Sequence, residues 1–313
     1  MSQSPVVRML FASEWSPRGS AVEALLRLRP ALLQQAIGNG ARSALLSSQG
    51  WLVQWHEGSV EAVAAQRDAT QAAFGLGSPR LLHGSHGAGL LAQPVQLASL
   101  QMSDAAGDML RRLQFLERQH ELGWDAEPLD VWHSLCAPCR FPGGWRPGLV
   151  GPREMVALVS DENDAVELLR DLAGHFGARV AYQRYAGSDL QRRDVGAAYV
   201  DVEAGDAMMT RVQALSPRAL GAGTDLLVLR RIDRFVLLVN PQSAARSTLL
   251  DEVARMVGRL PTRPWVHVMC PCPASRAWAA QQLRGSCGVA VLPVEAPCTG
   301  HTAVQALHGV LMA

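Results

Sequence analysis

The 313-residue chain is long enough for about two domains, and its 48% hydrophobic and 18% charged residues supply material for packed cores, which excludes a disordered chain. A formal net charge of +1 lacks the basic excess that attracts nucleic acid or anionic lipid, so neither is expected as a partner. The sequence contains no lysine, which excludes a P-loop lysine, a Schiff-base lysine and a lysine general base.

The N-terminal stretch MSQSPVVRMLFASEW carries an arginine in a short apolar run and lacks a cleavage-site pattern. No run of about 18 uncharged apolar residues occurs anywhere in the chain. We therefore expect a cytoplasmic protein. Its six cysteines are too few for a disulfide scaffold and are expected to be reduced thiols.

The first hundred residues predict a regular alternation of strands and helices. Their order β-α-β-β-α-β-β predicts a ferredoxin-like α+β domain over residues 1–121, a mostly antiparallel sheet with both helices on one face. A further helix after Ser103 and Asp104 would cover the open face. The predicted strands cover residues 5–13, 42–48, 51–56, 79–83 and 95–102, and the helices begin after Ser20 and Ser59.

Residues 122–152 are crowded with proline and glycine, and we interpret them as an interdomain linker. From residue 153 to 313, apolar runs alternate with helical patterns. They predict an α/β domain with a doubly wound, mostly parallel sheet. Its predicted strands are 155–160, 179–184, 197–202, 234–239, 266–270 and 289–293, and its predicted helices are 165–176, 248–260, 274–283 and 302–312.

Two segments of the first domain carry a family resemblance. The runs Asn39-Gly-Ala-Arg-Ser-Ala-Leu-Leu and Gly50-Trp-Leu-Val-Gln-Trp-His-Glu-Gly58 resemble the BLUF family of flavin-binding blue-light sensors over roughly residues 5–104. The resemblance implies a flavin cofactor, FAD. It also implies that Asn39 hydrogen-bonds the flavin ring and that the amide of Gln54 rearranges in response to light. Without a flavin, Asn39 would end a helix in the left-handed conformation, beside Gly40. Gln54 would then face solvent, and Trp51 and Trp55 would pack on the sheet.

Other positions depart from the family pattern. Arg8-Met-Leu-Phe-Ala-Ser13 matches the first strand, but Phe11 stands where the family has its photoactive tyrosine. Phenylalanine has neither a hydroxyl to donate nor a phenol to oxidise, so the usual photochemistry is not expected. The Gly-Ile-Thr-Gly of the family is replaced by residues 43–46, and of its Phe-x-x-Trp-x-Met ending only Met102 remains.

The second domain resembles, in element order, a small bacterial GTPase of the gliding-motility type. Its first strand leads into Ser160-Asp-Glu-Asn-Asp164, which has no glycine, no lysine and three acids, so P-loop binding of a nucleoside triphosphate is not expected. Asp161, Glu162 and Asp164 are interpreted as a helix N-terminus. Asp201 would lie near a metal-binding turn at Gly205, and Cys270-Pro-Cys-Pro273 replaces the guanine-reading motif. The resemblance implies a pseudo-GTPase.

Cys136-Ala-Pro-Cys139 has the spacing of a thiol oxidoreductase motif, but linker-like residues flank it. We interpret Cys136 and Cys139 as structural thiols, with redox chemistry or metal binding as alternatives. No hydrolase triad or paired-carboxylate motif is present, so no catalytic residue is assigned.

The sequence thus predicts a non-catalytic signalling or scaffold protein that acts through contacts with another protein, such as a GTPase, or with itself. The first alternative is a flavin-binding blue-light or redox sensor whose site includes Asn39, Gln54 and Phe11. The second is a thiol oxidoreductase that uses Cys136 and Cys139.

Overall fold

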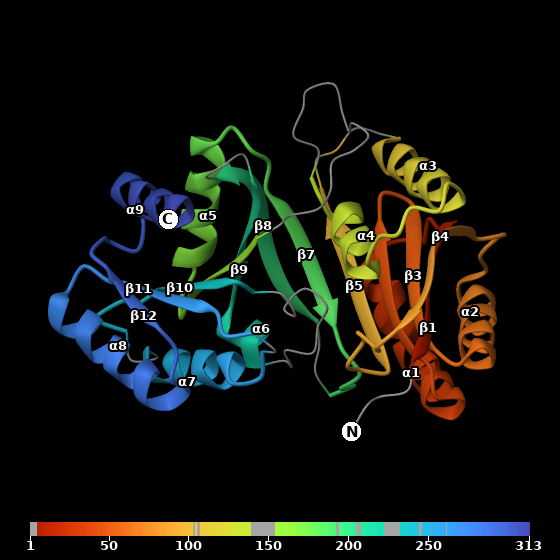
Figure 1. The fold of residues 1–313 in the computed structure, drawn as a ribbon, viewed down its shortest axis with the longest axis horizontal. Helices are drawn as coiled ribbons and strands as arrows, with labels where there is room; N and C mark the ends of the chain where they lie inside the picture. The colour runs from red at the N-terminus through yellow and green to blue at the C-terminus, as the bar shows by residue number, and fades with distance from the viewer. Residues whose placement is uncertain are drawn as a thin grey trace. The chain divides into compact units, whose positions relative to one another are not determined.

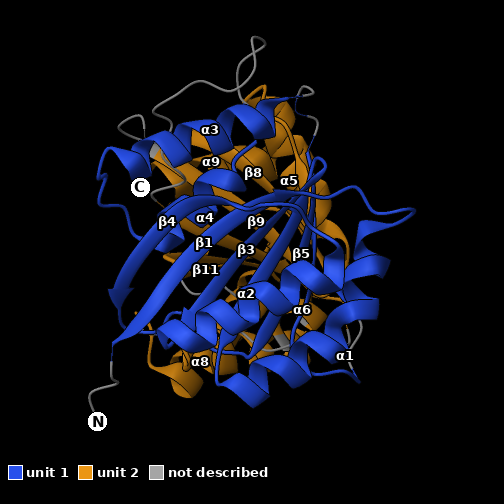
Figure 2. Cartoon of the chain, turned by 90° about the vertical axis from the view of Figure 1, so that its right-hand side faces the viewer, with its two compact units in different colours: residues 1–151, 183–195, 225–227 blue, residues 152–182, 196–224, 228–313 orange. Residues whose placement is uncertain are grey.

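The computed structural model describes residues 5–102, 104, 107–138, 154–191, 194–204, 208–221, 232–243, 246–260 and 262–313. It divides into two compact units. Unit 1 comprises residues 1–151, 183–195 and 225–227, and unit 2 the rest (Figure 2). Within the described residues, we find no helix that combines the length and apolar character needed to cross a lipid bilayer.

Unit 1 has the predicted β-α-β-β-α-β-β order (Figure 1). Its strands lie in the order β5-β2-β3-β1-β4. All neighbours are antiparallel except β2 and β5. The elements are β1 (Val6–Glu14), α1 (Ala21–Asn39), β2 (Arg42–Ser48), β3 (Trp51–Gly58), α2 (Val60–Phe74), β4 (Arg80–Gly87) and β5 (Val95–Gln101). The predicted mixed α/β class is confirmed.

Local sequence signals explain where these elements begin and end. Ser20 accepts a hydrogen bond from the backbone N–H of Glu23 at the start of α1, and Ser59 accepts one from Ala62 at the start of α2. Gly40 ends α1 in the left-handed conformation (φ 73°). The tight turn predicted between β2 and β3 is present, with positive φ at Gln49 and Gly50.

Both long helices of unit 1 pack on one face of its sheet, as predicted. Leu45 of β2 and Leu52 of β3 belong to one buried cluster with Leu25 and Leu32 of α1. The opposite face is covered by α3 (Asp108–Glu121) and α4 (Pro128–Leu135), and Trp132 of α4 lies 5.9 Å, centroid to centroid, from Trp55.

The structure differs from the predictions in both of these later helices. The helix expected to begin after Ser103 and Asp104 begins instead at Asp108, after Gly107. Helix α4 occupies part of the predicted linker. Pro128 starts it at a position where the missing N–H costs nothing, and Val131, Trp132 and Leu135 share its buried side. A proline-rich stretch therefore hides a short helix that packs on the sheet.

Unit 2 contains the predicted doubly wound, mostly parallel sheet, with strand order β12-β11-β10-β6-β9-β8. Only the β8–β9 pair is antiparallel among the pairs described in this sheet. Its strands are β6 (Glu154–Ser160), β8 (Val195–Ala204), β9 (Met208–Leu215), β10 (Arg234–Leu238), β11 (Trp265–Met269) and β12 (Val291–Val294), and β7 (Ala181–Ala186) crosses the boundary between the units.

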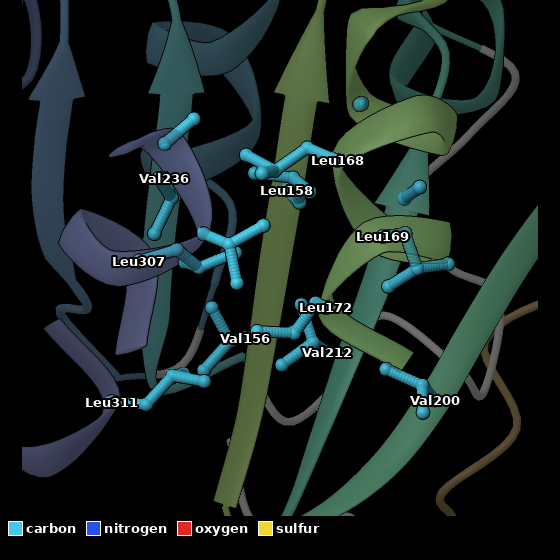
Figure 3. Close-up of a cluster of buried hydrophobic side chains, with 14 of the residues drawn as sticks. Val156, Leu158, Leu168, Leu169, Leu172, Val200, Val212, Val236, Leu307 and Leu311 are labelled. Atoms are coloured by element: carbon cyan, nitrogen blue, oxygen red, sulfur yellow. The ribbon is translucent and has the colours of Figure 1, made fainter. Parts of the chain in front are cut away.

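The helices of unit 2 are α5 (Asp164–His175), α6 (Pro217–Gly221), α7 (Arg246–Val257), α8 (Pro273–Cys287) and α9 (His301–Met312). Leu168 and Leu172 of α5 and Leu307 of α9 pack on Val156 and Leu158 of β6 (Figure 3). Helices α7 and α8 contact each other on the other face of the parallel strands (Figure 1). This core holds the carboxyl ends of β6, β10 and β11 at one edge.

Strand β9 and helix α6 were not predicted. Arg211 and Gln213 interrupt the apolar pattern of β9, yet both side chains are buried. Arg211 is compensated by Asp201, which lies directly opposite on β8. The arginine donates to the two carboxylate oxygens at 2.7 and 2.8 Å.

Candidate functional site

A buried polar cluster lies in unit 1 on the side of the sheet that α1 and α2 cover. Its buried members are Ser43 on β2, Gln54 and His56 on β3, and Gln66 on α2, and the half-buried Asn39 at the end of α1 adjoins them. Gln54 and His56 are two residues apart on β3, so they point to the same face as Leu52, which packs against α1. Polar groups in such a position need hydrogen-bond partners.

His56 links the two neighbouring strands of this cluster. Its Nδ1 lies 2.9 Å from Ser43 Oγ and its Nε2 lies 3.2 Å from Gln54 Oε1. Burial, with a smaller effect of the Arg67 charge, lowers the pKa of His56 to about 3. The ring is therefore neutral at pH 7. With Gln54 Oε1 as acceptor, Nε2 carries the proton and Nδ1 accepts from the Ser43 hydroxyl.

The amide nitrogens of two glutamines in the cluster lack a partner. Gln54 and Gln66 are both fully buried, and Nε2 of each has no hydrogen bond within the described part of the chain. The expectation that a flavin-free Gln54 faces solvent is wrong, because β3 is covered on both faces and all eight of its residues are buried. Leaving a buried donor unpaired costs about 1–3 kcal/mol, so these N–H groups are ready to bind an acceptor.

Asn39 is held by the protein through both ends of its amide. Its Oδ1 accepts from the backbone N–H of Ala41 at 2.9 Å, and its Nδ2 donates to Gln66 Oε1 at 3.0 Å. Asn39 ends α1, as expected, but Gly40 rather than Asn39 takes the left-handed conformation. Asn39 therefore fastens the end of α1 to α2.

Phe11 lies beside the cluster on β1, directly opposite Gln54 in the register of the two strands. Its ring centroid is 6.4 Å from that of His56, and the guanidinium carbon of Arg67 lies 5.8 Å from the Phe11 ring. The position implied for a photoactive tyrosine thus holds an apolar ring next to the Gln54 amide. No hydroxyl is present there to complete the hydrogen-bond chain.

The two tryptophans of β3 pack on the sheet, as expected of them without a flavin. Trp55 is fully buried against Trp132, and Trp51 is buried with the guanidinium carbon of Arg80 5.9 Å from its ring. Both project to the face opposite Gln54, because they are an odd number of residues away from it. They take no part in the polar cluster.

The acidic segment after β6 forms the loop that leads into α5. Asp164 lies in the first turn of α5, which confirms its interpretation, while Asp161 and Glu162 precede the helix. Ser160 Oγ donates to Glu162 O and accepts from the backbone N–H of Ala165. Burial, followed by the charges of Glu167 and Asp161, raises the pKa of Asp164. Such a field disfavours a triphosphate.

Asp201 does not lie at a metal-binding turn, and this implied role is wrong. It is in the middle of β8, it is 2% exposed, and both oxygens of its carboxylate are bonded to Arg211. Gly205 falls outside the described residues. Within the described residues we find no group of three or more potential ligands that could hold a metal ion.

Cys136 follows α4 and is 2% exposed, whereas Cys139 lies outside the described residues. Cys136 therefore lies at the C-terminal end of a helix, where the helix dipole does not favour a thiolate. Its redox and metal roles remain hypotheses.

Sequence reasoning singled out Gln54 but assigned no role to Ser43, His56, Gln66 or Arg67. The spacing of Ala62, Gln66 and Thr70 along α2 could have indicated that Gln66 is buried. Residues four apart lie on one face of a helix, and the apolar Ala62 marks that face as the one that packs on the protein. That spacing places the glutamine on the buried side.

Comparisons with known proteins return BLUF-containing structures. BlsA in its photo-activated state is 15% identical, with 42% of this chain and 91% of that one covered, at a TM-score of 0.28. A structure described as BlrP1 BLUF is 14% identical, with 31% of this chain and 66% of that one covered, just under two thirds, at a TM-score of 0.26. Klebsiella pneumoniae BlrP1 with FMN and cyclic diGMP is 15% identical, with 92% and 71% covered, at a TM-score of 0.28.

TM-scores below 0.5 do not establish a shared fold, so the proposals below are drawn from the contacts of this chain and from its sequence pattern. No protein-family model matches the sequence, and no curated protein matches it.

Proposed function

We propose that unit 1 is a flavin-binding sensory module and that the polar cluster is the place where the flavin ring binds. The observation that carries this proposal is the Gln54 amide, which is fully buried and has an unpartnered N–H₂ group while its oxygen is bonded to His56. The sequence resemblance assigns flavin contact to this same residue. A flavin ring offers carbonyl oxygens and ring nitrogens as acceptors, which fits the unpaired donors of Gln54 and Gln66.

The residues of the cluster would have separate tasks in this module. Gln54 and Gln66 would donate to the ring, while the neutral His56 and Ser43 would hold the orientation of the Gln54 amide. Asn39 would hold α1 to α2 rather than contact the ring directly. A bound flavin would supply blue-light absorption and reversible electron transfer. Phe11 removes the hydroxyl of the usual photoactive position, which favours redox sensing over light sensing.

Unit 2 would transmit the signal by binding a protein partner, without catalysis. The acidic loop after β6 and the engaged Asp201 support an output unit that does not use a nucleoside triphosphate. A GTPase or a second copy of this chain is the proposed partner. The resemblance to small GTPases remains a hypothesis about ancestry.

A cofactor-free adaptor is a second candidate, and two observations favour it. Asn39 already uses both ends of its amide within the protein. Gln54 and Gln66 are fully buried where α1 and α2 cover the sheet, so flavin binding at the polar cluster requires α1 and α2 to separate.

A titration of the purified chain with FAD and with FMN distinguishes the two candidates. The flavin-binding proposal predicts saturable, stoichiometric quenching of flavin fluorescence, which is lost in Gln54→Leu and retained in Gln34→Leu, an exposed position on α1. If the parent chain binds neither flavin, the sensory proposal is wrong and the adaptor is supported. Equal binding by parent and Gln54→Leu would place the flavin elsewhere.

A further inference from the structure

The segment Cys270-Pro271-Cys272-Pro273 of unit 2 joins a strand to the N-terminus of a helix. Cys270 follows the last residue of β11, and Cys272 is the N-cap of α8, a helix of 15 residues. Pro273 occupies the first turn of that helix, so it removes no N–H that the helix needs. A dithiol placed between a strand and a helix N-terminus has the surroundings that make one thiol reactive.

The two thiols differ in the way that thiol–disulfide exchange requires. Cys272 is partly exposed, and the nearby backbone N–H of Ser275, followed by the Ser275 hydroxyl, lowers its pKa. Cys270 is fully buried, and burial raises its pKa. Its Sγ lies 3.5 Å from Cys272 O, so the two residues are in contact.

The spacing of the two cysteines permits a bond between them. Pro271 lies in a bend, so the Cα atoms of Cys270 and Cys272 are closer than the roughly 6.6 Å that separates residues two apart along an extended chain. A disulfide needs about 4.4–6.8 Å. Cys272 has extended backbone angles (φ −91°, ψ 116°), and Arg276 holds the loop by donating to Cys270 O at 2.7 Å.

A groove of about 800 Å³ begins at Pro273, next to Cys272, and follows α8. Arg276 and Arg284 line it, together with Pro293. Arg276 is paired with Glu295, whereas Arg284 donates to Val291 O and has no carboxylate partner among the described residues. The groove therefore offers excess positive charge to a substrate that carries carboxylates.

We propose that Cys272 and Cys270 form a thiol–disulfide exchange site that reduces small disulfides bearing carboxylates. The Cys272 thiolate attacks one sulfur of the substrate disulfide, forms a mixed disulfide and releases the other half as a thiolate. Cys270 then loses its proton to water, and its sulfur attacks Cys272 Sγ and expels the second substrate thiolate. The two electrons gained by the substrate come from the two cysteines, which end as a disulfide.

The other thiols of unit 2 serve as internal controls. Burial, followed by the charge of Asp164, raises the pKa of Cys298 to about 12. Burial also raises the pKa of Cys287, at the far end of α8, where its Sγ donates to Leu283 O. Cys287 is the last residue of α8, where the helix dipole does not favour a thiolate, and the high pKa of Cys298 keeps its thiol protonated although it interacts with Cys270. Both are therefore expected to react more slowly than Cys272.

The test uses the full chain, reduced and then exposed to oxidised glutathione at pH 7, with intact mass spectrometry and peptide mapping. Cys270→Ser is expected to accumulate one glutathionyl group on Cys272, and the parent to lose two hydrogens and join Cys270 to Cys272. Cys272→Ser should form neither the glutathione adduct nor the disulfide at this site. Cys298→Ser should form the same Cys270–Cys272 disulfide as the parent. Cys272 should react about fivefold or more faster than Cys287.

Two further measurements examine the groove and the fold. Neutral hydroxyethyl disulfide is expected to react more slowly than oxidised glutathione, and Arg284→Gln should remove that preference. Circular dichroism of each variant excludes a change of fold as the cause. The proposal is overturned if Cys272 reacts no faster than Cys287, or if the disulfide survives Cys270→Ser and disappears in Cys298→Ser.

Discussion

Replacement of Gln54 by leucine tests whether its amide nitrogen is unpaired in the free protein and donates to a bound ligand. The change removes the acceptor of His56 Nε2, which leaves a buried N–H unpaired at a cost of about 1–3 kcal/mol. It also removes the amide nitrogen, which is already buried and unpaired in the parent at a similar cost. The two effects offset each other. We therefore expect the free energy of unfolding of the ligand-free variant to lie within about 1 kcal/mol of that of the parent.

Urea denaturation followed by tryptophan fluorescence measures this difference, with and without FAD. FAD at one hundred times its dissociation constant should stabilise the parent by about 2.7 kcal/mol and Gln54→Leu by nothing measurable. The control variant Gln34→Leu changes an exposed position on α1. Its free energy of unfolding should lie within about 0.5 kcal/mol of that of the parent, and FAD should stabilise it as much as the parent. If Gln54→Leu lowers the free energy of unfolding by more than about 2 kcal/mol without ligand, the amide nitrogen of Gln54 already has a hydrogen-bond partner in the parent. That result would refute the reasoning.

Three further changes have defined outcomes. Because the folded pKa of His56, about 3, lies below its ordinary 6.5, only the unfolded chain binds this proton as the pH falls from 6.5 toward 3. The stability that His56 contributes is thus lost over that window, by about 2 kcal/mol at pH 5, and urea denaturation should show a smaller loss in His56→Gln. Flavin-loaded Phe11→Tyr should show a light-induced red shift that the parent lacks, and identical difference spectra would contradict this. Arg211→Met should cost about 3–5 kcal/mol by stranding the buried Asp201, and adding Asp201→Leu should restore most of it in thermal denaturation.

The element order of unit 1 was predictable because short-range signals agree with the tertiary fold. The Ser20 and Ser59 caps and the Gln49-Gly50 turn each act within a few residues, and the sheet uses them as the sequence indicates. Parallel strands of unit 2 were also predictable, because strands buried on both faces read as continuous apolar runs.

The features that were missed depend on contacts between distant residues. Gln54 looks like a solvent-facing position of a strand, and only α1 and α2, which pack on its face of the sheet, bury it. Arg211 interrupts the pattern of β9 and is tolerated only because Asp201 lies opposite. Helix α4 was hidden by neighbouring prolines, although Trp132 anchors it on Trp55. A single sequence does not show such compensation.

The side-chain amide resonances of glutamine give the most direct test of the central claim. In the full chain labelled with ¹⁵N only in glutamine side chains, Gln54→Leu identifies the signal of the Gln54 N–H₂ group. Addition of FAD should shift that signal and slow its exchange with water, while the Gln34 signal stays unchanged. A Gln54 signal that does not move at saturating FAD would contradict flavin binding at the polar cluster.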